Sequence, residues 1–193
     1  MFLSIAATAQ SSKDAPAFRP AAAGGYPSRQ VIGKLTLAAV KYESDEETRA
    51  PFGKTNPNEF GVLPVLLVLE NKGDQTLLLD RMRVAYQAPD RTNLDPTPAE
   101  DLPYLKGVKR PNTGPRYPSP IPLPRRNKNP LATPELDTRS FSARTLLPGE
   151  AAHGFFYFQT RHKRNAVLYV TGIREGVTNK EVFFAEIPLD SPQ

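Results

Sequence analysis

The sequence predicts an all-β fold, an antiparallel sandwich of about seven strands. Short segments rich in β-branched and aromatic residues recur along the chain, turn signals separate them, and no segment shows convincing helical periodicity. A long proline-rich insert at residues 88–135 divides these segments into an early and a late set, because proline cannot join a helix or a sheet interior. A chain of 193 residues is long enough for one such domain with a real core.

The early set begins with residues 30–42, which carry apolar side chains on alternate positions and end at an acidic loop, residues 43–47. The next segment, residues 60–70, has apolar side chains at both odd and even positions, which predicts a strand buried on both faces. Pro64 would be costly inside a helix, which also favours a strand. Another part of the chain must therefore cover the second face of this strand.

Short connections predict which strands pair. The turn at residues 71–74 contains a glycine, so we expect it to join residues 60–70 and 77–87 in a hairpin. The late set consists of residues 139–147, 153–160, 165–173 and 181–189. The connections at residues 161–164 and 175–180 are short enough to predict antiparallel hairpins.

Two patterns in these segments resemble secreted bacterial immunoglobulin-like domains. VLLVLENKGD at residues 65–74 combines an apolar strand with an Asn-x-Gly turn, and LDxxxVxY follows at residues 79–86. LLPGE at residues 146–150 is a proline-glycine-acid turn that leads to GFFYF at residues 154–158. The resemblance covers about half of the chain and implies an immunoglobulin-like sandwich that serves as an extracytoplasmic adhesion, assembly or accessory module. No catalytic or binding residue can be assigned from this resemblance. The chain differs from the family pattern in its long proline-rich insert and in its lack of cysteine.

The composition excludes several kinds of chemistry. The chain contains no cysteine, which rules out disulfides, thiolate nucleophiles and cysteine metal sites. No run reaches the roughly 18 apolar residues of a membrane span, and no motif requires a cofactor. The net charge of +5 favours anionic surroundings such as glycan, lipid headgroups or nucleic acid.

The N-terminal residues indicate export. Ala7-Thr8-Ala9 has the small-x-small pattern of a secretory cleavage site, although a basic region is missing and the apolar stretch is short. We therefore interpret residues 1–29 as the remainder of a signal peptide followed by a disordered tether, with an alanine-rich disordered terminus as the alternative. Residues 30–193 form the single domain, which is expected to be periplasmic or secreted.

Neither histidine lies in a catalytic or metal-binding pattern. His153 starts a strand and His162 lies in a basic turn, and no Gly-x-Ser-x-Gly motif accompanies them, so we expect ordinary surface or half-buried side chains. Two short segments rich in acidic residues could offer oxygen ligands to calcium. Neither has the glycine-containing loop that would make a calcium site a specific prediction. Their residues are Glu43, Asp45, Glu46 and Glu47, and Asp90, Asn93 and Asp95. We predict neither a metal site nor catalytic residues.

The proline-rich insert is the predicted partner-binding segment, because a polyproline strip loses little entropy on binding. The residues assigned to this role are Tyr104, Arg116, Tyr117, Ile121, Leu123, Arg125 and Arg126. The insert could equally cover the second face of residues 60–70, with side chains such as Leu102, Leu105 and Ile121.

The sequence thus predicts a non-enzymatic binding or assembly module of the cell envelope whose partner is another envelope protein, with an anionic glycan or lipid surface as a further partner. A hydrolase of envelope polymers that uses paired carboxylates is the first alternative. The second is a cytoplasmic nucleic-acid-binding β-protein, in which Tyr104 and Tyr117 would stack bases among the basic residues of the insert.

Overall fold

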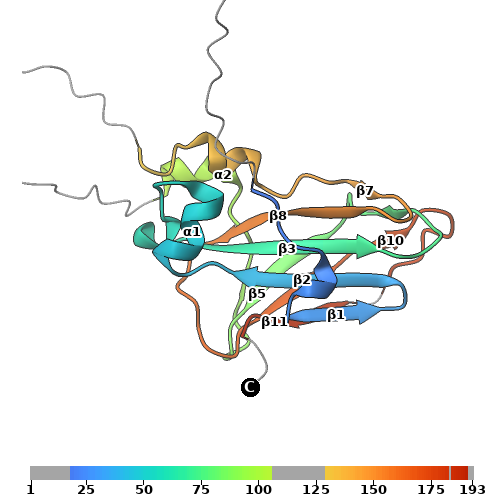
Figure 1. The fold of residues 1–193 in the computed structure, drawn as a ribbon. Helices are drawn as coiled ribbons and strands as arrows, with labels where there is room; N and C mark the ends of the chain where they lie inside the picture. Colours follow the sequence, from blue (N-terminus) through green and yellow to red (C-terminus); the bar gives the residue numbers. More distant parts are fainter. Residues whose placement is uncertain (1–17, 106–128, 183, 191–193) are drawn as a thin grey trace, which may run out of the picture.

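The computed structural model of this protein describes residues 18–105, 129–182 and 184–190. Within them the fold is mostly β, with eleven strands in three antiparallel sheets, two short α-helices and three 3-10 helices (Figure 1). The prediction of a strand-rich, antiparallel fold is confirmed. The expectation that the chain lacks helices was wrong.

Two four-stranded sheets and one small sheet make up the fold. The first sheet has the order β1 (Arg29–Ile32), β2 (Leu35–Lys41), β3 (Leu63–Asn71) and β8 (Ala151–Phe158). The second has the order β11 (Ala185–Pro188), β9 (Val167–Thr171), β5 (Arg83–Gln87) and β6 (Asn93–Leu94). The small sheet contains β10 (Arg174–Glu175), β4 (Leu77–Leu78) and β7 (Thr145–Leu146).

The larger core lies between the two four-stranded sheets. β3 contributes Leu67 and Leu69, which are fully buried there. They meet Tyr86 of β5 and Leu168 of β9, which the register places side by side in the second sheet. Because each strand alternates its side chains between faces, these four residues represent the inward half of their strands.

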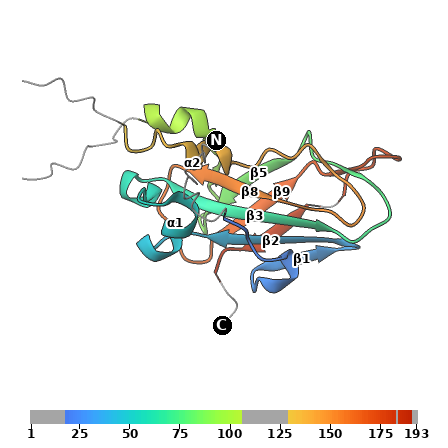
Figure 2. The ribbon, with the colours of Figure 1, turned by 45° about the horizontal axis from the view of Figure 1, so that its top comes forward.

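A second core covers the outer face of the first sheet. It receives Leu66 of β3 and Phe155 of β8 from the sheet itself. Its cover comes from α1 (Asp45–Phe52), α2 (Pro134–Thr138) and the 3-10 helices η1 (Ala23–Gly25) and η3 (Ala99–Tyr104). The short helix η2 (Pro57–Phe60) leads into β3. Figure 2 shows α1 and α2 near the same end of β3 and β8, and both helices contribute to the second core. The predicted burial of both faces of this strand is therefore confirmed.

The ends of the insert form part of this cover. Leu102 and Leu131 are buried in the second core, and Leu105 packs against it. Tyr104, by contrast, is 82% exposed. Ile121 and Leu123 lie outside the described residues.

The predicted acidic loop proves to be the start of a helix. Ser44 caps α1 by accepting from the backbone N–H of Glu47, and the Glu47 carboxylate accepts in return from the backbone N–H of Ser44, which completes a capping box. The helix is short and contains Pro51, so it has little of the apolar periodicity that predicts a helix. Its capping signal, Ser-x-x-Glu, was nevertheless present in the sequence.

Two predicted hairpins were wrong. β3 pairs with β2 and β8 rather than with residues 77–87, and that segment divides into β4 of the small sheet and β5 of the second sheet. The connection at residues 161–164 likewise crosses from the first sheet to the second. The last predicted hairpin is confirmed, because β9 and β11 pair antiparallel.

The boundaries of two other segments also differ from expectation. Residues 30–42 form two strands, because Gly33 takes a positive φ of 59° and reverses the chain between β1 and β2. Residues 139–147 contribute the two-residue strand β7. Ahead of it, Phe141 N–H donates to the carbonyl of Phe155 at 3.1 Å, so this segment runs along β8.

We expect Gly154→Ala to destabilise the fold. A Cβ atom at this position would lie 2.4 Å from Cα of Phe141, a backbone contact that cannot relax by rotation of a side chain. Overpacking of this kind costs about 2–3 kcal/mol in the free energy of unfolding. Urea denaturation measures the loss. Gly24→Ala is the matched control, since nothing lies within 4 Å of its Cβ position, and an equal effect of the two substitutions would contradict the expectation.

Candidate functional site

The outer face of the second sheet has no covering layer among the described residues, in contrast to the outer face of the first. We call it the open face and define it by the outward positions of β5, β9 and β11. The register places Ala85, Tyr169 and Glu186 in one row across it. The Tyr169 ring lies 5.6 Å from the ring of Phe184, measured between centroids, and Phe184 is 51% exposed. The open face therefore carries a half-buried tyrosine beside an exposed phenylalanine.

The rest of the open face is mostly uncharged. Thr171 and Val167 flank Tyr169 along β9, and Gln87 lies beside Val167 on β5. Its charged groups are Arg83 on β5 and Glu186 on β11. Such a surface offers large, stiff contact groups and few charges that would have to be desolvated.

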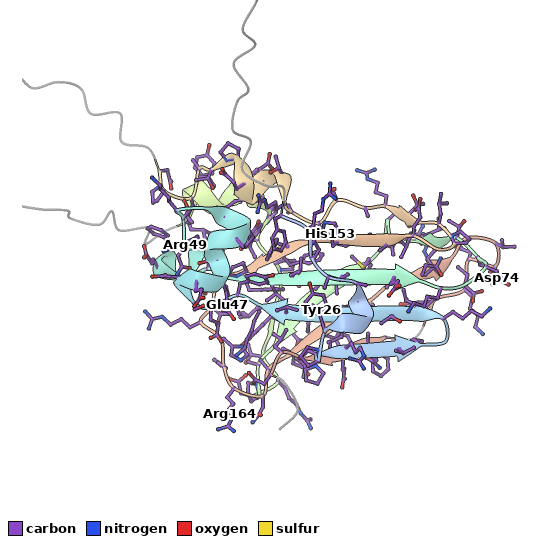
Figure 3. The ribbon with its side chains drawn as sticks, in the orientation of Figure 1. Tyr26, Glu47, Arg49, Asp74, His153 and Arg164 are labelled. Carbon is purple, nitrogen blue, oxygen red and sulfur yellow. The ribbon has the colours of Figure 1, made fainter. Side chains whose placement is uncertain are left out.

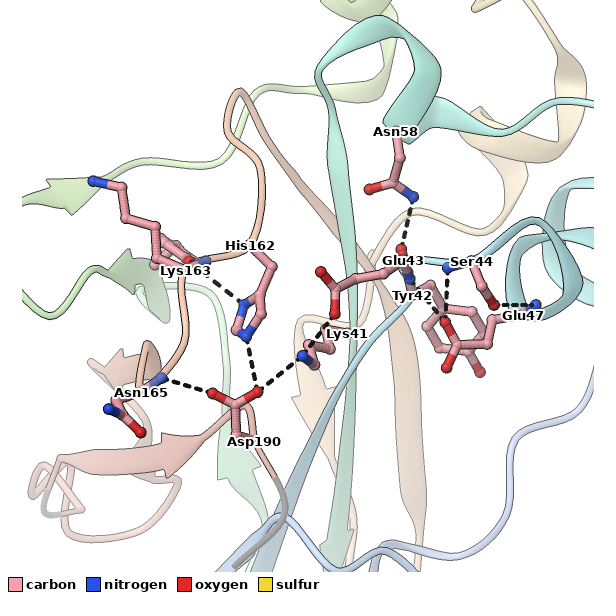
Figure 4. A network of polar contacts seen from close by, with 11 residues as sticks. Lys41, Tyr42, Glu43, Ser44, Glu47, Asn58, His162, Lys163, Asn165 and Asp190 are labelled. Carbon is pink, nitrogen blue, oxygen red and sulfur yellow. Dashed lines mark hydrogen bonds and ion pairs between the residues drawn. The ribbon is translucent and has the colours of Figure 1, made fainter.

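A polar cluster ties the two four-stranded sheets together at one end (Figure 4). We call it the loop-end cluster; it comprises Lys41, Tyr86, His162, Asn165 and Asp190. The Asp190 carboxylate accepts from Lys41 Nζ at 2.8 Å, from His162 Nε2 at 2.9 Å and from the Asn165 backbone N–H at 2.7 Å. It therefore joins β2, the connection between β8 and β9, and the chain after β11.

The opposite side of the His162 ring faces Tyr86. The tyrosine oxygen lies 3.5 Å from His162 Nδ1 and accepts from the backbone N–H of Lys163 at 2.8 Å. His162 has a side chain that is 5% exposed, so the prediction of an ordinary surface or half-buried histidine understated its burial. Burial also raises the pKa of the Tyr86 hydroxyl.

Electrostatics explain why Asp190 carries the negative charge of this cluster. The hydrogen bond from Lys41 is the main reason that the pKa of this carboxyl lies well below the ordinary range of an aspartate. Burial opposes this shift with a smaller effect than that of Lys41, and the bonds from Asn165 and His162 lower the pKa further. Its side chain remains 29% exposed.

The order Tyr86, His162, Asp190 superficially matches a nucleophile, a base and an orienting carboxylate. Tyr86 is fully buried, however, so a substrate could not reach its hydroxyl. The cluster instead fixes the connection between β8 and β9, in which Arg161 and Arg164 are exposed. Arg164 lies at the edge of the molecule (Figure 3). The loop-end cluster therefore holds this connection in position.

The predicted partner-binding residues fall mostly outside the described part of the chain. Tyr104 is the exception, and it is exposed at the end of η3. Arg116, Tyr117, Ile121, Leu123, Arg125 and Arg126 lie in the undescribed residues 106–128, so their assignment stays a prediction.

The predicted acidic groups have structural partners. Glu47 caps α1, and Asp90 accepts from the Thr92 backbone N–H and pairs with Lys163. Within the described residues, no three histidine or acidic side chains converge as a metal site would require. The helices described here are also too short and polar to cross a membrane.

Sequence reasoning did not single out Tyr169 and Phe184. Alternation along residues 165–173 distinguishes two faces, but it does not tell which of them remains uncovered. The loop-end cluster had no sequence signal either, because His162 lies 28 residues from Asp190 and 76 from Tyr86.

No protein-family model matches this chain. No curated protein matches it either.

We expect Asp190→Asn to lower stability at neutral pH. The depressed pKa means that the ionised carboxylate contributes stability above the ordinary aspartate pKa of about 3.9, and this contribution is lost as the pH falls toward the folded-state pKa. The variant should be less stable at about pH 7 by about 2 kcal/mol. It should also lose less stability than the intact chain between about pH 4 and about pH 2.

Urea unfolding at a series of pH values measures both effects. Asp74→Asn, at an exposed turn position, is the control and should leave stability nearly unchanged. Identical pH profiles of the intact chain and the Asp190 variant would contradict the assignment.

We expect the fold to tolerate replacement of residues 106–128 by a short Gly-Ser linker. The Asn129 side chain donates to the Pro103 carbonyl, so the two described ends of this segment already lie together. The core residues Leu102 and Leu131 stay in the chain. Circular dichroism and a cooperative thermal transition test the result. Loss of the transition would show that the replaced segment is needed for folding.

Proposed function

We propose that this protein is an immunoglobulin-like domain that works as a non-enzymatic binding or assembly module outside the cytoplasm, in the periplasm or as a secreted protein. Its partner is another protein of the cell envelope. The proposal is carried by the open face, a sheet surface with the aromatic pair of half-buried Tyr169 and exposed Phe184.

Support for the immunoglobulin-like part comes from the order of the strands. In immunoglobulin domains the first, second and fifth strands lie in one sheet and the third, sixth and seventh in the other. Here β2, β3 and β8 are neighbours, and β5, β9 and β11 are neighbours in the second sheet. β6 extends that sheet as in variable-type domains. The small third sheet and the helical cover are additions to this plan.

Support for a protein partner comes from the chemistry of the open face. Aromatic side chains are enriched at protein interfaces and dominate their binding energy, whereas charged side chains are depleted at interface centres. Tyr169 lies at the centre of the face, and Arg83 and Glu186 carry opposite charges beside it. A polyanion would instead need a surface of one sign.

Support for an extracytoplasmic location comes from the sequence alone. Ala7-Thr8-Ala9 has the pattern of a secretory cleavage site.

The double substitution Tyr169→Ala and Phe184→Ala tests the proposal. The tagged intact chain and the variant are used to capture proteins from an envelope extract of the source organism, and the affinity of each captured partner is then measured with the purified components. Because buried aromatic contacts carry much of an interface's energy, we expect binding to weaken at least about tenfold.

Val177→Ala is the matched control, since Val177 is exposed in the connection between β9 and β11 and is not one of the residues that define the open face. The thermal transition of each variant must first be shown to be intact. A folded double variant that keeps every partner at unchanged affinity would disprove the proposed surface.

A further inference from the structure

A second surface feature is independent of the open face. An open hollow of about 350 Å³ lies against the outer side of β8. Its volume falls within the range of small-ligand sites. The residues that matter for its chemistry are Phe18, Arg139, Ser140, Ser142, His153 and Gly154. They come from three segments that are distant in sequence, namely the start of the described chain, the segment after α2, and β8.

The close approach of two of these segments is specific. Gly154 has no side chain, which lets the backbone at Phe141 lie directly against β8. The Phe155 backbone N–H donates to the Arg139 carbonyl at 2.8 Å, so the segment is bonded to the strand on both sides of Ser140. Ser140 and Ser142 are thereby held beside His153, which lies on β8 (Figure 3).

Arg139 supplies the charge of the hollow and has a defined position. Its guanidinium carbon lies 5.5 Å from the centroid of the Phe18 ring, and its Nη1 donates to the Ala50 carbonyl at 3.1 Å. A guanidinium group has five N–H donors in a fixed plane, so this bond leaves most of them for another acceptor. Contacts to Phe18 and Ala50 limit the freedom that Arg139 would lose on binding a ligand.

The described lining of this hollow contains hydrogen-bond donors and no carboxylate. Arginine, histidine and serine side chains can all donate to an anion. Two other hollows differ in this respect. The one beside α1 includes Asp45 and Glu59, and the one beside the turn between β1 and β2 includes Asp74, Glu175 and Glu181. Carboxylates repel an anionic ligand there.

We propose that the hollow at β8 binds a phosphate or sulfate group, free or as the terminal group of a small molecule. Charge-assisted hydrogen bonds from Arg139 would provide the main attraction, and the serine hydroxyls and His153 would complete the site. Donor side chains from two segments, residues 139–142 and β8, line the space, and the Phe18 ring of a third segment borders it. This arrangement suits an acceptor with oxygen atoms in several directions better than a planar carboxylate with two.

The test is a titration of the full chain with inorganic phosphate, sulfate and acetate at constant ionic strength, followed by amide chemical shifts. We expect saturable binding of phosphate or sulfate with a Kd of about 1 mM or lower. The shifts should centre on residues 139–142 and 153–155. Arg139→Gln and His153→Ala should each raise the Kd at least about tenfold.

Arg144→Gln is the matched control, because Arg144 is exposed on the same segment and lies outside the hollow. It should leave the Kd unchanged. Arg139 also contacts Ala50, so its variant is interpreted only with an intact thermal transition, and His153→Ala provides the independent measurement. Linear, non-saturating shifts, an unchanged Kd in His153→Ala, or acetate binding as tight as phosphate binding would each overturn the proposal.

Discussion

The burial of β3 on both faces is the constraint on which the rest of this structure depends. Leu67 faces the core between the two large sheets, and its neighbour Leu66 faces the helical cover. Exposing either side chain would cost about 1.5–3 kcal/mol. A single pair of packed sheets would leave the second side of β3 in water, so the chain adds a third layer of short helices. The ends of the proline-rich insert belong to this layer, because Leu102 and Leu131 are buried in it.

The same constraint determines which surfaces remain for binding. The helical layer, which includes α1 and α2, covers the outer face of the first sheet. The outer face of the second sheet has no such layer among the described residues. At the edge of the helical layer, the segment after α2 turns back along β8 and forms the hollow with His153. The loop-end cluster acts in a complementary way, since Asp190 and Tyr86 hold the crossing connection between the sheets. The open face and the hollow therefore both lie on strands of the packed sheets.

The differences between the predicted and the observed pairing have one physical cause. An apolar pattern reports how much of a strand is buried, but it does not identify the neighbouring strand. Residues 60–70 and 77–87 both read as strands with a turn between them, which favoured a hairpin. The Asn71 side chain instead accepts from the Gly73 backbone N–H and donates to the Gln75 and Leu146 carbonyls, which directs the chain toward the small sheet. Its partner in β7 is 75 residues away in sequence.

The sequence by itself determined the strand-rich class, the two-sided burial of β3 and the exclusion of cysteine chemistry, because each follows from residue type and local periodicity. The sequence also contains the capping signal for the start of α1, at Ser44 and Glu47. Only the tertiary structure decided that Tyr169 and Phe184 lie together on the second sheet and that Arg139 and His153 line the same hollow. Both depend on which distant elements pack together, and that choice is made by the summed burial of the whole core rather than by any local pattern.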